Sequence, residues 1–464
     1  MKQTKDWREA VVRDDAGYFV LRNDDTNGVE VRLFLTDSLL ESAEDNLYAQ
    51  IRNAAAFPGV RLVVITPDVH YGYGVPVGCV ILTDAVDGAI AMGPVGFDIG
   101  CGMMSARSEV PSSSATADKK LAFNREVMRR VAMGAGGKSR RFAGLDEPEF
   151  ERLVRGGAEY YIDKFGATID RGLAERDRLP VDDEWKIPWG GRGRPERGIG
   201  QIGTLGGGNH FIELQRETRD DTLFLQVHTG SRGFGHGLAT NYFDLARAEK
   251  PDKIAHLDLG YFTPDSRHYR EYLNAVSAGG NFAIVNRLAI YEDVARAFSD
   301  VFDAELHLVY EISHNLVQLE THPEFGDVWV HRKGATRAFG PNHPALRDTR
   351  WHDRGHPVLI PGSNMDYSFI LRPLEGAVKS AYSVNHGAGR RMSRTQAERT
   401  LDRRETDRRY RDAGILVNAD GKVPIDESAP CYKPSREVID AVREAGLAEV
   451  EHELWPLASL KGTD

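Results

Sequence analysis

The sequence predicts an α+β fold, built as one large domain over residues 1–464. Three observations lead to this prediction. Short apolar segments typical of strands are mixed with longer amphipathic segments typical of helices. No Pro/Ser/Gly-rich linker or low-complexity segment divides the chain. Several apolar segments end in a Gly/Ser/Asn turn that carries a polar side chain, an arrangement by which sheet-based proteins present site residues.

The expected strands are short and strongly apolar. They comprise residues 61–66, 75–83, 223–227, 305–311, 328–331 and 358–360. The first of them runs into Pro67, where we expect a turn. The segment 223–227 delivers His228 at its end, and the segment 305–311 delivers His314.

The expected helices occupy most of the remaining periodic sequence. Residues 282–302 have the clearest amphipathic period, and residues 235–249 also read as helical. Residues 117–166 are expected to be mainly helical, and residues 391–413 to form one polar helix. The chain has no internal repeat of solenoid length.

Composition places the chain among ordinary soluble proteins. Hydrophobic residues make up 41% of it and charged residues 28%. A prior of roughly 150 residues per domain would give three domains, but the missing linkers favour one. No run of eighteen apolar residues is present, and the first ten residues, MKQTKDWREA, lack the apolar core of a signal peptide. We therefore expect a cytoplasmic protein with no membrane segment.

Charge is distributed unevenly. The net charge of -10 argues against a protein that coats nucleic acid, which requires a broad cationic surface. Residues 390–411 nevertheless contain nine arginines and only four acidic residues. One interpretation is a solvated helix with i,i+4 ion pairs. The other is a phosphate-binding segment beside a functional site. The glycine- and arginine-rich residues 189–194 are expected to form a surface loop.

Five side chains in four dispersed segments suit a metal site. They are Asp98 and Cys101 in one short segment, then His210, His228 and His314 in glycine-, serine- or asparagine-rich turns. Carboxylate, thiolate and neutral imidazole are all metal donors. A single such histidine is most often a turn or core residue, and Cys101 alone could be a small buried hydrophobe. Because five potential ligands all occur in such segments, a metal centre is favoured over five unrelated residues. Two ions are plausible, and ligand softness alone makes zinc the first guess.

His386 is set in a different context. The segment Asn385–Arg390 places its imidazole in a glycine turn with Arg390 and Arg391 beside it. Such a histidine can act as a nucleophile on a phosphoryl group, or as a loop residue or general base. Residues 229–233, 331–337 and 361–363 read as further turns that could cradle an oxyanion. The chain has neither a P-loop nor a Rossmann fingerprint.

These motifs together resemble the RtcB family of RNA-splicing ligases over residues 20–462. The motifs that carry the resemblance are Pro67–Gly74, Gly96–Cys101, Gly203–Phe211, His228–Gly233, His314–Asn315, His331–Arg337, His386–Arg390, Tyr432–Lys433 and Lys461–Gly462. The resemblance implies one α+β domain of the RtcB-type fold, with mixed sheets and helices packed around a central metal site. It also implies two manganese ions and GTP.

Residue by residue, the resemblance assigns roles to most of the motifs. Cys101 is the ligand shared by both metals; His210 and His228 complete one site, and Asp98 and His314 complete the other. His386 attacks the α-phosphate of GTP and holds GMP covalently. The guanylate contacts implied by the resemblance are Asn209, Glu213, Asn315, Ser363, Ser368, His386, Gly387, Ala388, Gly389, Arg390, Tyr432 and Lys461. The implied partners are RNA ends, with an archease-type activator left open, and the protein is expected to be a monomer.

The sequence departs from the family pattern in three places. Residue 100 is glycine where Asp-Ile-Asn-Cys is common, and Gly207 stands where Gly-Ser-Gly-Asn-His has serine. Residues 362–368 differ from the usual Gly-Ser-Met-Gly-Thr-x-Ser. All the implied metal ligands and the histidine nucleophile are present.

Three functions remain to be distinguished. The leading hypothesis is an RNA ligase that joins 3′-phosphate or 2′,3′-cyclic phosphate ends to 5′-hydroxyl ends through histidine-GMP and RNA-3′-pp-5′-G intermediates. The alternative enzyme is a metal-dependent phosphodiesterase or phosphatase that acts on RNA ends without ligation and without need of His386. A third hypothesis is a metal-stabilised RNA-binding protein without catalysis. The resemblance implies a role in RNA repair or tRNA splicing.

Overall fold

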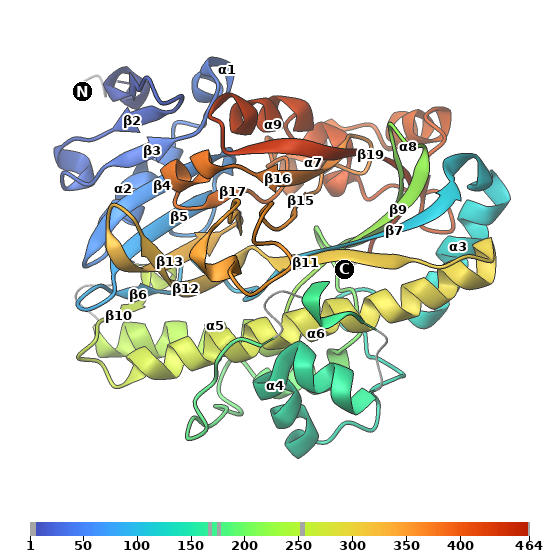
Figure 1. Ribbon diagram of the computed structural model, residues 1–464, viewed down its shortest axis with the longest axis horizontal. Coiled ribbons are helices and arrows are strands. Elements are labelled where there is room, and N and C mark those ends of the chain that lie inside the picture. The colour runs from blue at the N-terminus through green and yellow to red at the C-terminus, as the bar shows by residue number, and fades with distance from the viewer. Residues whose placement is uncertain (1–5, 166–168, 174–177, 251–255, 463–464) are drawn as a thin grey trace.

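The computed structural model describes residues 6–165, 169–173, 178–250 and 256–462 (Figure 1). Within these residues two large mixed sheets form the body of the molecule. The first sheet has the order β1 (Val12–Arg13), β2 (Phe19–Leu21), β3 (Val31–Leu33), β4 (Val60–His70), β5 (Val77–Asp84), β13 (Gly326–Lys333) and β12 (Asn315–His322). Its pairs are antiparallel except for β3 with β4.

The second sheet is built mainly from later parts of the chain. Its order is β11 (His307–Ser313), β7 (Gly102–Pro111), β9 (Thr222–Thr229), β8 (Phe211–Glu217), β19 (Ala448–Leu460), β16 (Ser368–Pro373) and β15 (Val358–Ile360), with β18 (Leu416–Val417) pairing beside β19. Two small ribbons are β6 (Ile90–Ala91) with β10 (Tyr261–Phe262), and β14 (Ala335–Arg337) with β17 (Ser383–Asn385).

Helices cover the outer faces of these sheets. They are α1 (Asp37–Glu41), α2 (Leu47–Ala55), α3 (Ala117–Arg130), α4 (Glu147–Phe165), α5 (Arg232–Glu249), α6 (His268–Phe302), α7 (Arg394–Thr400), α8 (Arg403–Asp412) and α9 (Ser435–Glu444). The long helix α6 crosses the molecule, with α4 and α5 against it (Figure 1). It contacts β7, β9 and β11 of the second sheet and β12 of the first.

The core explains why the strands read as continuous apolar runs. In β4, Val63 and Ile65 pack towards α2, whereas Leu62 and Val64 pack into a core shared by the two sheets. In β7, the neighbours Met103 and Met104 likewise belong to different cores. Because both faces of these strands are buried, apolar residues follow one another without alternation. The expected α+β fold with mixed sheets is confirmed, and the single-domain interpretation stays a prediction.

Three expected boundaries are wrong. Strand β4 continues through Pro67 to His70, and its regular pairing with β5 lapses between Ile65 and His70. Proline lacks an N–H donor, so it is tolerated in this irregular stretch. Helix α6 begins at His268 rather than at residue 282. The polar segment 391–413 forms two helices, because Asp402 caps α8 by accepting a hydrogen bond from the Glu405 amide at 2.7 Å.

The other expected elements are found close to their expected bounds. Strand β15 coincides with residues 358–360, and α5 begins three residues before the expected helix at 235. Residues 117–166 divide into α3 and α4, with turns and loop between them, and residue 166 lies outside the described residues. Among the helices that the structure describes, none combines the length and apolar character needed to cross a membrane.

Candidate metal centre and adjoining cavity

The candidate site lies where the two large sheets meet. Strand β11 of the second sheet ends at Ser313 and β12 of the first begins at Asn315, so His314 alone connects them. Cys101 directly precedes β7, in which Gly102 pairs with Ser313 of β11 and Met103 pairs with His228 of β9. Strand register therefore brings Cys101, His228 and His314 together from three segments that are far apart in sequence.

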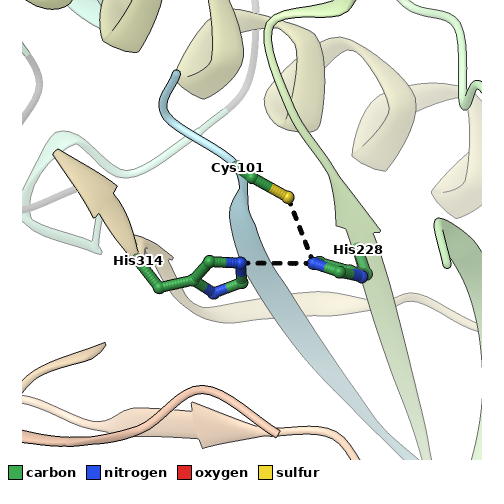
Figure 2. Close-up of side chains that lie close together, drawn as sticks. All are labelled: Cys101, His228 and His314. Carbon is green, nitrogen blue, oxygen red and sulfur yellow. Dashed lines mark hydrogen bonds between the residues drawn. The ribbon is translucent and has the colours of Figure 1, made fainter. Parts of the chain in front are cut away.

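The donor atoms of these three residues face one another (Figure 2). The Cys101 Sγ atom lies 3.2 Å from His228 Nε2, which is 3.3 Å from His314 Nε2. A second cluster shares the same cysteine: His210 Nε2 lies 3.6 Å from Cys101 Sγ and 3.0 Å from Asp98 Oδ2. The structure brings together all five residues that the sequence predicts as metal ligands, and Cys101 is common to both clusters.

The pairing of ligands differs from the expected one. The resemblance put His210 with His228 and Asp98 with His314, whereas the donor atoms group as Cys101, His228 and His314, and as Asp98, Cys101 and His210. The reason is topological. His228 lies on β9 and His314 directly follows β11, and these two strands flank β7 on either side; Asp98 and His210 come from the loops that precede β7 and β8.

Both clusters fit a divalent cation. Two ligands that each lie about 2.0–2.3 Å from one ion are at most about 4.6 Å apart, and the measured separations are shorter. The Nδ1–H groups of His210 and His228 donate to the carbonyls of Leu205 and Asn209, at 3.1 and 3.2 Å. This fixes the tautomer that leaves Nε2 with a free lone pair.

Electrostatics favour a cation as well. Burial, together with nearby histidines, lowers the pKa values of His228 and His314 well below the usual value, so both rings are neutral. Burial and the Asp98 charge raise the pKa of the Cys101 thiol well above normal. Burial alone would raise the pKa of Asp98, but the neighbouring His210 imidazole and the charge of Arg232 lower it. A bound cation would offset the carboxylate charge and stabilise the thiolate.

The loop 229–233 contacts the candidate metal ligand Asp98. The Ser231 amide donates to Asp98 Oδ1 at 3.0 Å, so this amide already has an anionic partner. Residue 230 must be glycine, because a Cβ there would lie 2.2 Å from Asp98 Oδ1. The turn therefore holds Asp98, and the expectation that it also cradles an oxyanion stays a prediction.

His386 lies beside the first cluster and is held by a buried carboxylate. Its ring is 4.9 Å from the His314 ring, measured between centroids. Its Nδ1 atom lies 2.6 Å from Asp68 Oδ2, which also accepts from the His386 and Gly387 amides. Burial opposes ionisation of Asp68, but the charge and hydrogen bond of His386 outweigh it and lower the pKa of that carboxyl. An ionised Asp68 only accepts, so Nδ1 carries the proton and Nε2 is left as a nucleophile or base.

A cavity of about 450 Å³ is lined by His386 and by four of the five candidate metal ligands, Asp98, Cys101, His228 and His314. Its lining also includes most of the residues expected to contact guanylate, and the part that they form is here called the nucleotide lobe: Asn209, Glu213, Asn315, Ser363, Gly387, Ala388, Gly389, Arg390, Tyr432 and Lys461. Ser368 is not among the lining residues that the structure describes. Its hydroxyl accepts from the Gly362 amide and from Gln215 Nε2, each at 3.0 Å, behind the cavity wall.

Two buried carboxyl groups dominate the nucleotide lobe. Glu427 forms ion pairs with Arg390 at 3.1 Å and with Arg394 at 2.9 Å. Its carboxylate also accepts a hydrogen bond from the Tyr432 hydroxyl. Burial works against ionisation, yet the charge of Lys461 and these partners lower the pKa of Glu427. Glu213 has fewer partners, and burial raises its pKa to about 7.

Each interpretation of the arginine-rich segment, as a solvated helix or as part of a functional site, fits a different part of it. Arg390 and Arg394 line the nucleotide lobe, whereas the arginines of α8 are exposed. Arg408, for example, pairs with Glu405 on the same helix at 2.5 Å. Residues 189–194 form a surface turn in which Arg192 pairs with Asp244 at 2.7 Å, away from the lining of the cavity.

Three residues important to this site carried no assigned role in the sequence analysis. Asp68 lies within the motif Pro67–Gly74, so the motif signalled its position but not its contact with His386. Arg287 of α6 is buried, and nothing in a helical period marks it as a site residue. Glu427 falls in a short segment without a recognisable pattern and becomes visible only through its contacts with Arg390, Arg394 and Lys461.

Comparison with known proteins gives the family. A sequence model described as "tRNA-splicing ligase RtcB" matches residues 50–462. The chain belongs to the RtcB family. Curated relatives include the tRNA-splicing ligase RtcB of Thermococcus kodakarensis, 33% identical over 93% of this chain and 94% of the relative. The RNA-splicing ligase RtcB of Mycobacterium tuberculosis is 34% identical over 89% of this chain and its whole length. The Methanococcus maripaludis protein is 31% identical over 93% and 94%.

Membership of the RtcB family confirms the expected family and the expected enzyme class, an RNA ligase. Two departures from the family pattern have structural reasons here. Gly100 has φ +73°, and a Cβ at that position would lie 2.8 Å from the Gly280 Cα of α6. Asn364 accepts a hydrogen bond from Tyr410 of α8, and Asp366 accepts one from the Ser435 amide at 2.8 Å. The unusual residues thus pack against helices of this chain.

Proposed function

We propose that this protein is a GTP- and Mn²⁺-dependent RNA ligase that joins a 3′-phosphate or 2′,3′-cyclic phosphate end to a 5′-hydroxyl end, in RNA repair or tRNA splicing. The observation that carries the proposal is the position of His386. Its ring lies 4.9 Å from the His314 ring between centroids, and the same cavity is lined by His386, by metal donors and by the nucleotide lobe. A phosphorylated nucleotide in the lobe could present its phosphates to His386 and to those donors.

His386 is suited to nucleophilic attack on phosphorus. Because Asp68 accepts its Nδ1–H, the Nε2 lone pair is free. In the proposed first step Nε2 forms a bond to the α-phosphorus of GTP, and the bond from that phosphorus to the bridging oxygen breaks, releasing pyrophosphate. Asp68 offsets the positive charge that develops on the imidazole, as a carboxylate does for a catalytic histidine.

The later steps transfer GMP to RNA. After opening of any 2′,3′-cyclic phosphate, an oxygen of the RNA 3′-phosphate attacks the GMP phosphorus and the P–N bond breaks. This gives RNA-3′-pp-5′-G and frees His386. A 5′-hydroxyl oxygen then attacks the 3′-phosphorus, GMP leaves and the strand is joined. Activation is necessary because a bare 3′-phosphate lacks a good leaving group.

The five clustered donors support two cations, and the resemblance to the family makes manganese the assignment. Imidazole, carboxylate and thiolate also suit zinc, so elemental analysis of native protein tests the identity. When bound, such cations neutralise charge on phosphoryl oxygens. The chain's own contribution is a buried donor set whose His210 and His228 rings are oriented by backbone carbonyls.

The nucleotide lobe supports a guanylate ligand. Its wall includes the Ser363 hydroxyl, a buried group without a hydrogen-bond partner among the described residues. It also includes Glu213, whose carboxyl can accept from the adjacent N–H donors of a guanine edge when ionised. Arg390 and Lys461 add positive charge for phosphate or base oxygens.

The first test is covalent labelling. Wild-type protein incubated with Mn²⁺ and GTP labelled on its α-phosphate is expected to give an acid-labile adduct on a denaturing gel, and His386→Ala is expected to give none. His307→Ala, an exposed histidine on β11 outside the cavity, serves as the matched control and should label normally. No adduct on wild type, or an adduct that survives His386→Ala, contradicts the proposal.

The same preparation distinguishes the alternative enzyme. A metal phosphodiesterase or phosphatase would open or remove terminal phosphates without GTP and would tolerate His386→Ala. RNA with a 3′-phosphate or 2′,3′-cyclic phosphate is the proposed partner, with or without an archease-type activator. A monomeric state and a cytoplasmic location remain predictions, which size-exclusion chromatography with light scattering and cell fractionation would check.

A further inference from the structure

Two exposed tyrosines stand at the rim of the cavity. Six large hydrophobic side chains are exposed among the described residues, and only Tyr71 and Tyr73 of these are aromatic. Both line the cavity, with exposed fractions of 53% and 73%. The other four, Val12, Val86, Met128 and Leu319, do not line it. Among these six residues, the exposed aromatic ones are therefore found only at the cavity.

The loop that carries the two rings is held firmly. The Gln50 side chain of α2 both donates to the Gly72 carbonyl, at 2.6 Å, and accepts from the Gly72 amide, at 3.0 Å. Asn53 donates to the Gly74 carbonyl at 2.8 Å. Lys333 Nζ donates to the carbonyls of Tyr73 and Val75 at 2.7 and 3.1 Å. A fixed backbone with free rings lowers the entropy cost of stacking a ligand on those rings.

The loop starts next to the proposed nucleophile. The His70 ring lies 6.5 Å from the His386 ring between centroids, with 23° between the planes. Tyr71 follows His70 directly, and exposure increases from Tyr71 to Tyr73. The loop thus starts beside His386 and ends in exposed rings that line the same cavity. The loop 71–77 contains no charged residue, so a ligand there is recognised by its apolar faces.

We propose that Tyr71 and Tyr73 form a stacking platform for unpaired nucleobases next to the reacting end of the RNA. This inference rests on the proposed function for its ligand class. Planar bases stack on exposed aromatic side chains irrespective of sequence, and every strand end to be joined presents them. A ligase that accepts different RNAs requires this kind of sequence-tolerant contact.

The test measures binding of short single-stranded RNAs to full-length, Mn²⁺-loaded protein without GTP, by fluorescence anisotropy. One oligonucleotide ends in a 3′-phosphate and another in a 5′-hydroxyl, and each is made with its terminal bases present or abasic. Tyr71→Ala and Tyr73→Ala are compared with Tyr73→Phe, which keeps the ring. Leu319→Ala, an equally exposed residue of β12 outside the cavity, is the control.

For at least one of the two ends, each alanine variant is expected to weaken binding of the base-containing RNA by roughly 5- to 100-fold. The loss should disappear with the abasic RNA, should not depend on salt, and should be absent in Tyr73→Phe and Leu319→Ala. The end that responds identifies which strand the platform holds. Equal binding of base-containing and abasic RNA by wild type and variants at both ends overturns the inference.

A second measurement separates this inference from the proposed function. Guanylylation of His386 does not involve RNA, so both alanine variants should form the GMP adduct at the wild-type rate. If they label slowly, the rings serve the nucleotide instead and the platform is rejected. If wild type forms no adduct but still shows the tyrosine-dependent preference for base-containing RNA, the proposed function fails while the platform stands.

Discussion

At the scale of single residues, the pairing of Asp68 with His386 determines which imidazole nitrogen keeps a free lone pair. Asp68→Asn keeps the size of the side chain but can donate an N–H to Nδ1, which would move the ring proton to Nε2. We expect GMP-adduct formation to slow by roughly 10²- to 10⁴-fold, as for other carboxylate-oriented histidines. Rapid-quench labelling measures the rate, and ¹⁵N NMR of the histidine ring reports the tautomer.

An unchanged adduct rate in Asp68→Asn with an unchanged tautomer would contradict the orienting role. Thermal unfolding of the variant serves as the control, because Asp68 also accepts from the His386 and Gly387 amides and its loss could loosen the turn. Because the single oxygen Oδ2 faces Nδ1 and both amides, an asparagine NH2 that donates to Nδ1 would leave those two amides without this acceptor.

Glu213 gives a prediction about pH. Burial raises the pKa of its carboxyl to about 7, so in the free protein it is protonated below that pH and ionised above it. If the ionised form accepts the N–H donors of guanine, apparent GTP affinity should increase as pH rises through about 7 and level off above it. Glu213→Gln should bind GTP more weakly and lose this pH step. Isothermal titration between pH 6 and 8.5 measures both, and a wild-type affinity that falls over this range contradicts the assignment.

At the scale of elements, helix α6 organises the metal centre through one buried arginine. Arg287 donates to the Gly100 carbonyl at 2.8 Å, to the Thr229 carbonyl at 2.9 Å and to the Ser313 hydroxyl at 2.7 Å. These atoms belong to the segments next to Cys101, His228 and His314. It also pairs with the buried Glu311. One side chain of α6 thus fixes the ends of three strands.

Arg287→Met should weaken metal binding roughly 10- to 100-fold, as loss of a residue supporting metal ligands commonly does. It should also destabilise the fold by about 3–5 kcal/mol, because Glu311 would be left buried and unpaired. The double variant Arg287→Met, Glu311→Met removes the unpaired charge and should recover stability without recovering metal affinity. Calorimetric titration with Mn²⁺ and thermal unfolding distinguish the two effects, and a double variant with wild-type affinity would show that Arg287 acts only on stability.

The elements also show which strands and helices a local sequence pattern can predict. The expected strands at 358–360 and 328–331 and the helix at 235–249 are found, because their period or apolar run is local. The sequence pattern does not predict the first part of α6, residues 268–281. These residues are buried on several sides and include the polar Asn274 and Asn281 in the interior. Burial of this kind weakens the amphipathic period from which a helix is recognised.

At the scale of the whole molecule, the metal centre connects the two sheets. His314 joins β11 to β12, Cys101 directly precedes β7 of the second sheet, and His228 lies on β9 of that sheet. Bound cations should therefore stabilise the fold, by about 2.7 kcal/mol per site at a concentration 100 times the dissociation constant. We expect a chelator to lower the melting temperature and Mn²⁺ to restore it.

Two cysteine variants make this prediction specific. Cys101→Ala removes the donor common to both clusters and should abolish the response to Mn²⁺. Cys79→Ala is the matched control, because Cys79 is buried in the first sheet outside both clusters and burial raises its pKa to about 12. Differential scanning calorimetry measures both variants, and an intact response in Cys101→Ala would exclude this cysteine as a ligand.

The sequence by itself determined which side chains are available and how the backbone near them turns. Asp98, Cys101, His210, His228, His314 and His386 could be named because residue type and flanking glycine, serine or asparagine are local properties. Only the tertiary structure decided how they are grouped, that Asp68 orients His386 and that Arg287 supports the centre. Those contacts depend on strand register and on helix–sheet packing between segments that are far apart in sequence. No periodicity within one segment specifies such contacts.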